Sequence, residues 1–256
     1  MKIKLFKKVL LASLFLSASS MATIVEFQTS HGNFQVNLFD QSTPETVTNF
    51  LTYVNEGNYN NTVIHRSIPN FVVQGGGYSF EGDFPLIGFE ANPAVNNEPV
   101  WSNVRGTIAM AKLPNQPDSA TNQWFFNVID NSDILDLQND GFTVFGSVID
   151  NGMQVVDEIS AIDQCSDIPM PDYSADDCSN ESVPGVENFV TIHQIVIVDA
   201  TENTEDDLSP EENVLIDIPP LLVPDENSGS SGGSSSWLML GLLSLLSFKR
   251  RAKLII

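Results

Sequence analysis

Apolar and polar residues alternate along much of residues 23–200, and the alternation has the two-residue period of β-strands. Residues 23–28 and 34–38 both show it, and the sequence Ser-His-Gly-Asn between them is typical of a tight turn. The pattern therefore predicts a β-hairpin at the start of the domain. Further short strands are expected around residues 63–66, 71–74, 107–111, 124–128, 143–148 and 189–198.

Two segments have the three- and four-residue spacing of apolar positions that marks an amphipathic helix. The first opens at Thr43-Pro44, where threonine is a favourable N-cap and proline a favourable first residue, and it ends at Gly57. The second covers residues 152–162. Many short strands with two helices predict a mainly β domain over residues 23–200. The expected architecture is a closed antiparallel β-barrel with one helix over each mouth.

The first 22 residues have the three parts of a secretory signal peptide. Four lysines precede an apolar run, and small residues ending at Ala22 form a cleavage site. A buried N-terminal helix is the alternative, but four lysines within eight residues suit a membrane-inserting end better than a core. Residues 1–22 are therefore expected to be removed on export.

The chain beyond residue 200 is expected to lie outside the domain. Residues 201–236 form a predicted linker, acidic and proline-bearing at first and rich in glycine and serine from residue 228. Residues 237–256 are a hydrophobic segment with a basic tail, expected to contact the membrane at least before processing. This ending resembles the GlyGly-CTERM sorting signals of Gram-negative bacteria, from which a membrane protease removes the helix. A permanent anchor is the alternative.

Charge separates the two ends from the rest of the chain. Eight of the 11 Lys and Arg residues lie in residues 1–22 and 237–256, and these two segments hold none of the 33 Asp and Glu residues. Arg66, Arg105 and Lys112 alone remain against these acids, which gives a formal charge of −30. Without a basic patch, nucleic-acid binding is excluded. Such a charge suits a salty exterior, where it is screened over about 10 Å or less.

The two cysteines, Cys165 and Cys178, lie in an acidic, proline-bearing insert at residues 163–188. In an exported chain a disulfide between them is expected. A metal site is one alternative, but no histidine lies near either cysteine. A catalytic redox pair is another, but the spacing of the two cysteines is not Cys-x-x-Cys. We therefore predict a structural disulfide and no metal.

Motifs for most enzyme chemistries are absent from the sequence. There is no Gly-x-Ser-x-Gly, phosphate loop, His-Glu-x-x-His or dinucleotide fingerprint. The three histidines have no sequence neighbours that mark a triad or a metal site, so each is expected to be structural. The three glycines at residues 75–77 lack the lysine and the following helix of a phosphate site. They predict a turn in which the chain adopts backbone conformations that other residues disfavour.

Four ordered segments resemble the signature blocks of the cyclophilin family of peptidyl-prolyl cis-trans isomerases. Residues 63–77 (VIHRSIPNFVVQGGG) contain its His-Arg…Phe…Gln-Gly-Gly pattern, and residues 106–112 (GTIAMAK) its Gly-x-x-Ala-Met-Ala block. Residues 119–128 and 142–148 match its Ser-Gln-Phe-Phe and Val-Phe-Gly blocks. The resemblance covers about residues 24–198 apart from the insert. It implies the barrel fold, proline-containing polypeptides as substrates and no cofactor.

The reaction that the resemblance implies needs neither a nucleophile nor a general base. Rotation about an X–Pro bond is slow because the C–N bond is partly double, with a barrier of about 18–20 kcal/mol. A fixed cationic donor beside the prolyl nitrogen favours the twisted state, in which that nitrogen can accept a hydrogen bond. Arg66 has the matching position in the family motif. A surface arginine in an ion pair is the alternative.

The resemblance adds Phe71 and Gln74 to the catalytic residues. Gln74 would hold a substrate carbonyl, and the main chain at Ala111 and Lys112 would pair with the substrate as an added strand. Gln123 would order the side of the site that holds the arginine. The implied substrate-binding residues are Val72, Ala111, Lys112, Gln123, Phe125, Ile134, Leu135 and Phe142.

Three positions depart from the pattern of many eukaryotic members. Ile134 replaces a tryptophan at the pocket rim, Phe142 replaces a histidine, and Lys112 replaces an asparagine. Bacterial members often differ at the first two positions and stay active, so activity is expected. Binding of the cyclic peptide cyclosporin is expected to be weak, because the indole N–H donor is missing.

The sequence therefore predicts an exported, monomeric prolyl isomerase that helps proteins fold in the periplasm or at the envelope or surface of a Gram-negative bacterium. The main alternative is a non-catalytic module that binds proline-containing segments. The presence of Arg66, Phe71, Gln74 and Phe125 favours the enzyme. A Ca²⁺-dependent adhesin is a third hypothesis, but no loop has the Asp/Asn spacing of a calcium site.

Overall fold

The computed structural model describes residues 23–200 and 208–216, so the predicted signal peptide, most of the linker and the C-terminal segment lie outside the described residues. The strands are β1 (Ile24–Thr29), β2 (Gly32–Leu38), β3 (Thr62–Val63), β4 (Arg66–Ile68), β5 (Val72–Gly75), β6 (Tyr78–Ser79), β7 (Ile87–Gly88), β8 (Thr107–Met110), β9 (Trp124–Asn127), β10 (Val144–Val148), β11 (Gln164–Cys165), β12 (Ile168–Pro169) and β13 (Thr191–Asp199). The helices are α1 (Pro44–Glu56), α2 (Ser132–Leu135), α3 (Gly152–Ser160) and α4 (Ala175–Ser179), with the short 3₁₀ turn η1 (Val186–Asn188). None of these helices is both long and apolar enough to cross a membrane.

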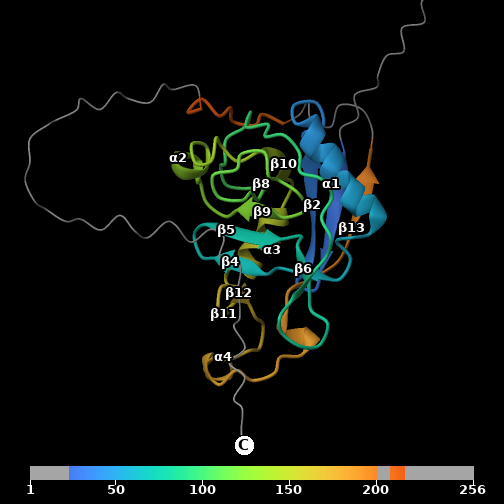
Figure 1. Ribbon diagram of the computed structural model, residues 1–256, viewed down its shortest axis with the longest axis vertical. Helices are drawn as coiled ribbons and strands as arrows, with labels where there is room; N and C mark the ends of the chain where they lie inside the picture. The colour runs from blue at the N-terminus through green and yellow to red at the C-terminus, as the bar shows by residue number, and fades with distance from the viewer. Residues whose placement is uncertain (1–22, 201–207, 217–256) are drawn as a thin grey trace, which may run out of the picture.

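Most of the strands form one antiparallel sheet, in the order β4-β5-β9-β8-β10-β2-β1-β13-β3-β6-β7 (Figure 1). Strands β3 and β4 are far apart in this order, yet only Ile64 and His65 join them in the chain. The sheet must therefore curl round on itself. Within the described residues no ladder joins edge strand β4 to the opposite edge. The mainly β, curled antiparallel architecture predicted from the sequence is thus confirmed, whereas full closure of the barrel stays a prediction.

The expected hairpin is formed by β1 and β2, which pair from Ile24↔Asn37 to Thr29↔Gly32. On its other side β1 pairs with β13, the last strand of the domain. The two ends of the domain thus lie side by side in the sheet. All the other predicted strands occur within a few residues of their expected positions.

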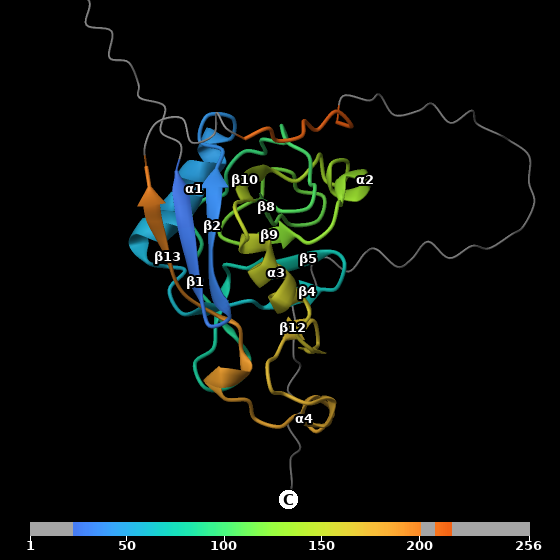
Figure 2. The same ribbon diagram turned by 180° about the vertical axis from the view of Figure 1, so that it is seen from behind.

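Helices α1 and α3 are the two predicted from the sequence, and they pack against different parts of the sheet (Figures 1 and 2). Pro44 begins α1, and Gly57 ends it in the left-handed conformation with a φ of 72°. Thr43 differs from its predicted role as the capping side chain, because its hydroxyl donates to Phe39 O. The Glu98 carboxylate accepts from the N–H groups of Glu45 and Thr46 instead, at 3.3 and 2.9 Å.

The main core is a cluster of aromatic rings enclosed by the sheet and by α1. Phe27 lies at its centre, stacked on Phe34 with ring centroids 5.0 Å apart. It also meets Trp124 and Phe126 edge to face, at 5.2 and 5.4 Å. Because Trp124 and Phe126 alternate with Phe125 along β9, this packing turns Phe125 to the opposite face of the sheet.

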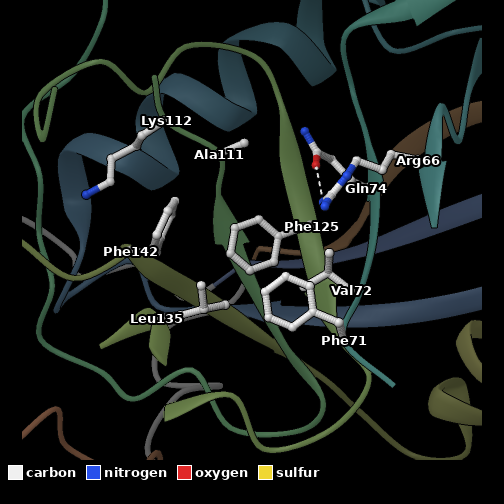
Figure 3. A pocket seen from close by; sticks show the side chains of 9 residues that line it. All are labelled: Arg66, Phe71, Val72, Gln74, Ala111, Lys112, Phe125, Leu135 and Phe142. Carbon is white, nitrogen blue, oxygen red and sulfur yellow. Dashed lines mark hydrogen bonds between the residues drawn. The ribbon is translucent and has the colours of Figure 1, made fainter. Parts of the chain in front are cut away.

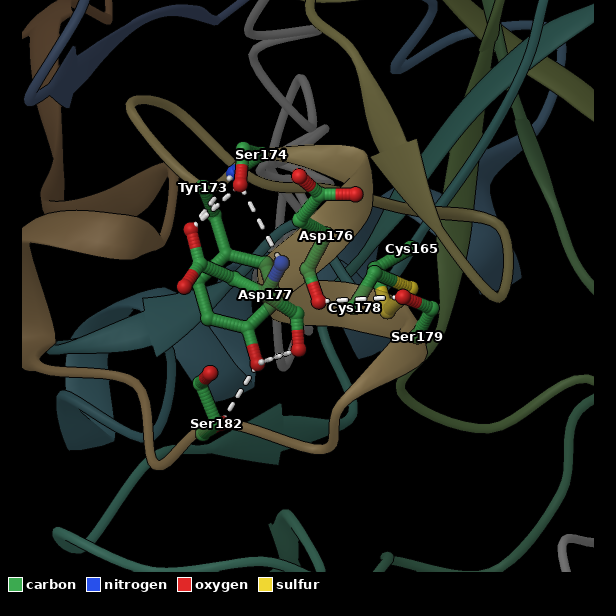
Figure 4. The surroundings of a disulfide bond; sticks show 8 residues. All are labelled: Cys165, Tyr173, Ser174, Asp176, Asp177, Cys178, Ser179 and Ser182. Atoms are coloured by element: carbon green, nitrogen blue, oxygen red, sulfur yellow. Dashed lines mark hydrogen bonds between the residues drawn. A yellow bond between two sulfur atoms is a disulfide. The ribbon is translucent and has the colours of Figure 1, made fainter.

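The insert at residues 163–188 forms a hairpin, β11–β12, followed by α4. The predicted disulfide is present between Cys165 and Cys178, whose Cα atoms are 5.6 Å apart (Figure 4). Ser174 and Asp177 form a capping box at the start of α4. Ile168 and Met170 are buried in a separate small cluster with Val63 of β3. The insert is therefore a folded part of the domain.

Residues 208–216 depart from the linker that the sequence predicts, because they pack on the domain. The N–H of Ser102 donates to Glu211 O at 2.7 Å, and the N–H of Asn213 donates to Val100 O at 2.9 Å. The side chain of Asn213 is buried and donates to Asp136 O, just after α2. This segment runs along the end of the domain that carries α2 (Figure 1). The predicted domain boundary at residue 200 is therefore too early.

Candidate active site

One pocket brings together nine residues that are far apart in the sequence (Figure 3). They come from β4 and β5, from the end of β8, from β9, and from the region of α2 and the loop after it. All nine are among the residues that the sequence predicts for the site. They are Arg66, Phe71, Val72, Gln74, Ala111, Lys112, Phe125, Leu135 and Phe142.

The sheet sets three of these side chains in a row. Arg66 pairs with Gln74 across β4 and β5, and Gln74 pairs with Phe125 across β5 and β9. Residues opposite one another in an antiparallel ladder project from the same face. Val72, two residues before Gln74, shares that face. The register thus places a cation, an amide and an aromatic ring side by side.

The apolar side of the pocket is well packed. Phe125 and Phe142 meet edge to face, with ring centroids 5.7 Å apart and planes at 75°. Leu135, at the end of α2, is buried beside them, and the N–H of Phe142 donates to Leu135 O at 2.9 Å. Phe71 packs against the same cluster. These side chains form a rigid apolar surface that can hold a ring such as that of proline.

The polar side of the pocket is a short chain of hydrogen bonds. Arg66 Nη1 donates to Gln74 Oε1 at 3.3 Å, and Gln74 Nε2 donates to Gln123 Oε1 at 3.0 Å. Burial lowers the pKa of the Arg66 guanidinium, and the charge of Asp167 acts in the opposite direction. The one ion pair within the described residues joins Arg105 to Asp157, so Arg66 is not the paired surface arginine of the alternative hypothesis. Gln123 does not line the pocket, and its role of ordering the arginine side stays a prediction that the bond from Gln74 supports.

His65 precedes Arg66 in the chain and does not line the pocket. Its ring lies edge to face with Tyr78, with centroids 4.8 Å apart. Burial lowers its pKa to about 4, and the neighbouring charge of Arg66 acts in the same direction. The ring is therefore neutral near pH 7, which fits the structural role expected from the sequence.

The three glycines after Gln74 make room for the side chains behind the pocket. Gly76 has a φ of 86°, and a Cβ there would come within 2.5 Å of Asn122 O. A Cβ on Gly77 would meet the Gln123 side chain at 2.8 Å. The glycine run is thus required by close packing and not by a phosphate ligand.

Lys112 supports the far wall of the pocket with a buried side chain. Its Nζ donates to Asn97 Oδ1, Asn139 O and Gly141 O, at 3.1, 2.8 and 2.6 Å. The same atom lies 4.9 Å from the centroid of the Phe142 ring. Burial lowers its pKa to about 8. The lysine side chain thus braces the loop that carries Phe142.

Two predicted substrate-binding residues have environments that refine their roles. The N–H of Ala111 donates to Gln123 O at 2.9 Å, so this donor is already used within the protein. Ile134 lies on α2 outside the pocket lining and is 38% exposed. It lies beside Leu135 in the chain and can contact a substrate only at the rim.

A buried carboxylate that supports α2 has no signal in the local sequence. Asp136 is 1% exposed, and it accepts from Ser102 Oγ at 2.6 Å and from the N–H and Nδ2 of Asn103 at 2.7 and 2.9 Å. These bonds fix the chain directly after Leu135. In a chain with 33 acids a single aspartate after an apolar residue does not stand out.

The described residues contain no group of three or more His, Cys, Asp or Glu side chains able to hold a metal ion. The arrangement that remains is a cation beside an apolar pocket, next to strand ends that can receive an extended chain. It can bind a peptide and place one hydrogen-bond donor against it. Such a site can stabilise a particular geometry of a bound peptide without forming a covalent bond.

Comparison with known proteins gives a consistent result. The family described as "Cyclophilin type peptidyl-prolyl cis-trans isomerase/CLD" matches residues 24–179. Peptidyl-prolyl cis-trans isomerase A of Dickeya dadantii is 45% identical over 148 residues, which cover 57% of this chain and 75% of that protein. Peptidyl-prolyl cis-trans isomerase B of Escherichia coli is 44% identical over 148 residues, covering 54% and 85%.

A solved structure shares the fold at lower identity. The crystal structure of a cyclophilin type peptidyl-prolyl cis-trans isomerase of Cryptosporidium parvum superposes with a TM-score of 0.50 at 21% identity. The match covers 69% of this chain and 97% of that one.

Proposed function

Because the chain belongs to the family of cyclophilin-type peptidyl-prolyl cis-trans isomerases, it is a prolyl isomerase, and we propose that it acts on exported polypeptides with Arg66 as the catalytic donor. The observation that carries the residue assignment is the position of Arg66. It is a half-buried cation at the mouth of an apolar pocket, and one neutral amide orients it.

The geometry accounts for the reaction as follows. The apolar surface of Phe71, Phe125 and Leu135 holds the proline ring, while the rest of the peptide stays free to turn about the C–N bond. In the twisted state amide resonance is lost and the prolyl nitrogen gains a lone pair. The guanidinium can donate to that lone pair, so it stabilises the twisted state more than either planar isomer. No bond to the substrate is made or broken.

The substrate main chain lies across the ends of β8 and β5 in this proposal. Gln74 holds a substrate carbonyl, and Lys112 contributes its main chain as the partner of an added strand. The Ala111 N–H is bound to Gln123 O, so pairing through Ala111 uses its carbonyl.

Export and membrane contact are further parts of the proposal. They are supported by the signal-peptide pattern of residues 1–22 and by the apolar segment with a basic tail at residues 237–256. The acidic composition of the remaining chain and a disulfide between Cys165 and Cys178 fit an oxidising exterior. We propose a monomer in the periplasm or at the envelope or surface of a Gram-negative cell.

The test of the catalytic assignment is cis-to-trans exchange of an X–Pro peptide with the wild type, Arg66→Ala and Arg105→Ala. Loss of one donor to a transition state costs about 10²- to 10³-fold in rate, so Arg66→Ala should be nearly inactive. Arg105 is bound to Asp157 away from the pocket, so Arg105→Ala should match the wild type. A folded wild type without acceleration would instead support the non-catalytic binding module.

The location is tested by cell fractionation. The full chain and a chain ending at residue 227 are followed with an antibody to the domain. Envelope or surface association of the full chain alone supports the sorting or anchoring role of the tail. A cytoplasmic full chain would contradict the proposed export.

A further inference from the structure

The disulfide-bonded insert covers the open edge of β4, the strand that begins with Arg66. This strand pairs with β5 on one side and ends the sheet on the other. On the open side the N–H of Ser67 donates to Asp167 O at 2.6 Å. Ser67 is fully buried. The insert thus supplies the hydrogen bond that an edge strand otherwise lacks.

The contact comes from the tip of a tight hairpin. Cys165 pairs with Ile168, so Ser166 and Asp167 are the two turn residues. Both have positive φ, 52° and 69°, as two-residue hairpin turns of this kind require. Aspartate tolerates this conformation better than most residues.

Two further features hold the hairpin in place. The bond from Cys165 to Cys178 ties it to α4 (Figure 4). Directly after the turn, Ile168 is buried in a cluster that contains Val63, the last residue of β3, which is separated from β4 by two residues only. The position of Asp167 relative to β4 is therefore set by a covalent bond, a main-chain hydrogen bond and buried apolar contacts.

Asp167 also acts on Arg66 through its charge. Arg66 is half-buried, and its hydrogen bond to Gln74, at 3.3 Å, is long for a bond to a cation. Burial disfavours the charged guanidinium, and Asp167 is the carboxylate whose charge offsets part of that effect on its pKa. Asp167 forms no ion pair with Arg66 within the described residues, so its charge acts on the guanidinium over a longer distance, from a hairpin whose main chain is bonded to Ser67, the next residue.

We propose that Asp167 is a positioning residue for Arg66, and that the disulfide-bonded hairpin is the support that keeps it there. This inference rests on the proposed role of Arg66 as the catalytic donor. Asp167 does not line the pocket and is not expected to touch the proline ring. Its removal should therefore lower kcat, because the donor is less well placed against the twisted state, and leave KM almost unchanged.

The first experiment compares Asp167→Asn with Asp172→Asn. Both residues are exposed aspartates of the insert with positive φ, and both changes remove one negative charge. Asp167→Asn should lower kcat about twofold to fivefold, the range of an exposed charge interaction, with KM within about twofold. Asp172→Asn should behave as the wild type. Equal kcat values for Asp167→Asn and the wild type would overturn the proposal.

Salt separates a charge effect from a loss of local structure. At about 1 M salt the screening length falls to about 3 Å, so wild-type kcat should approach that of Asp167→Asn. A difference that stays constant with salt would overturn the electrostatic role of Asp167.

The second variant removes the support and leaves the aspartate in the chain. A chain with both Cys165→Ser and Cys178→Ser should lose kcat at least as strongly as Asp167→Asn, measured where circular dichroism shows it to be folded. Wild-type kcat in this folded variant would overturn the role of the hairpin as a support. An inactive wild type would instead overturn the proposed function itself, so the two failures are distinguishable.

Discussion

Arg66 and Gln74 lie directly opposite one another on β4 and β5, and Arg66 Nη1 donates to Gln74 Oε1 at 3.3 Å. Only residues 69–71 join the two strands, so one short hairpin carries both groups. Gln74 in turn donates to Gln123, which comes from the chain just before β9. The direction of Arg66, the proposed catalytic donor, therefore depends on a residue that does not line the pocket.

Gln123→Ala should lower kcat/KM about fivefold, because a hydrogen bond of about 1 kcal/mol is lost from the network that orients Gln74. Without the Gln123 acceptor, the Gln74 amide can rotate and present its NH₂ group to Arg66. The measurement is peptide exchange by NMR. Gln116→Ala, the same change at an exposed residue, is the control. Equal kcat/KM for Gln123→Ala and the wild type would contradict the relay.

Lys112→Met should raise KM about threefold to tenfold and lower the free energy of unfolding by about 1–3 kcal/mol, since buried acceptors lose their donor. Methionine keeps most of the side-chain volume but cannot donate to Asn97, Asn139 and Gly141. The loop that carries Phe142 then loses its brace. Substrate titration together with urea unfolding measures both effects. An unchanged KM in a destabilised variant would show that the lysine supports the fold but not the pocket.

His65 should make the domain less stable as the pH falls from about 6.5 to 4. Its folded pKa of about 4 lies below its ordinary value of 6.5, so the unfolded chain binds the proton more readily over this range. The stability is fully present above pH 6.5 and is lost as the pH falls toward 4. A shift of this size corresponds to at most about 3 kcal/mol.

The carboxylates of this acidic chain also titrate in that range, so the test is the difference between the wild type and His65→Gln. Urea unfolding is measured at pH 7.5 and pH 4.5. The variant should be less stable than the wild type at pH 7.5, and the gap should narrow at pH 4.5. A gap that is the same at both pH values would show that His65 does not titrate as expected.

Eight of the nine pocket residues could be predicted from the sequence because they lie in short motifs of fixed spacing, whereas Leu135 lies outside these motifs and is implied only by the family resemblance. Alternation on β5 and β9 then decides which side chains share a face, so Val72, Gln74 and Phe125 follow from local pattern. The rim position of Ile134 follows from the family resemblance alone, because the four-residue helix α2 has too few residues to show a period.

The contacts that support the pocket from outside could not be predicted, because they join segments far apart in the chain. Asp136 meets Ser102 and Asn103 across more than 30 residues. Asp167 meets β4 across about 100 residues, through a main-chain bond for which any residue type would serve. Neither contact leaves a pattern in the local sequence. The same holds for residues 208–216, whose acidic composition resembles that of a linker.

A chain that ends at residue 200 should be less stable than one that ends at residue 216. The shorter chain loses the bonds of Glu211 and Asn213 to Ser102, Val100 and Asp136, three hydrogen bonds worth about 1 kcal/mol each. A difference of about 3 kcal/mol in the free energy of unfolding is expected. Urea unfolding of the two chains, both starting at residue 23, measures it. Equal midpoints would show that this segment adds no stability.

Ile134 should make the enzyme a poor target for cyclosporin. Many eukaryotic family members carry a tryptophan at this rim position, whose indole N–H can donate to the drug, whereas isoleucine has no donor. Ile134→Trp should therefore strengthen inhibition about tenfold, the effect of one hydrogen bond of about 1.4 kcal/mol. Leu137→Trp is the matched control, because it places the same ring just after α2 on an exposed residue outside the pocket lining. Inhibition of peptide exchange over a range of drug concentrations measures all three proteins. Tight inhibition of the wild type at nanomolar drug would show that the rest of the rim supplies the binding energy without the donor. Equal gains in inhibition for the two tryptophan variants would show that the drug requires added apolar area and not the N–H at position 134.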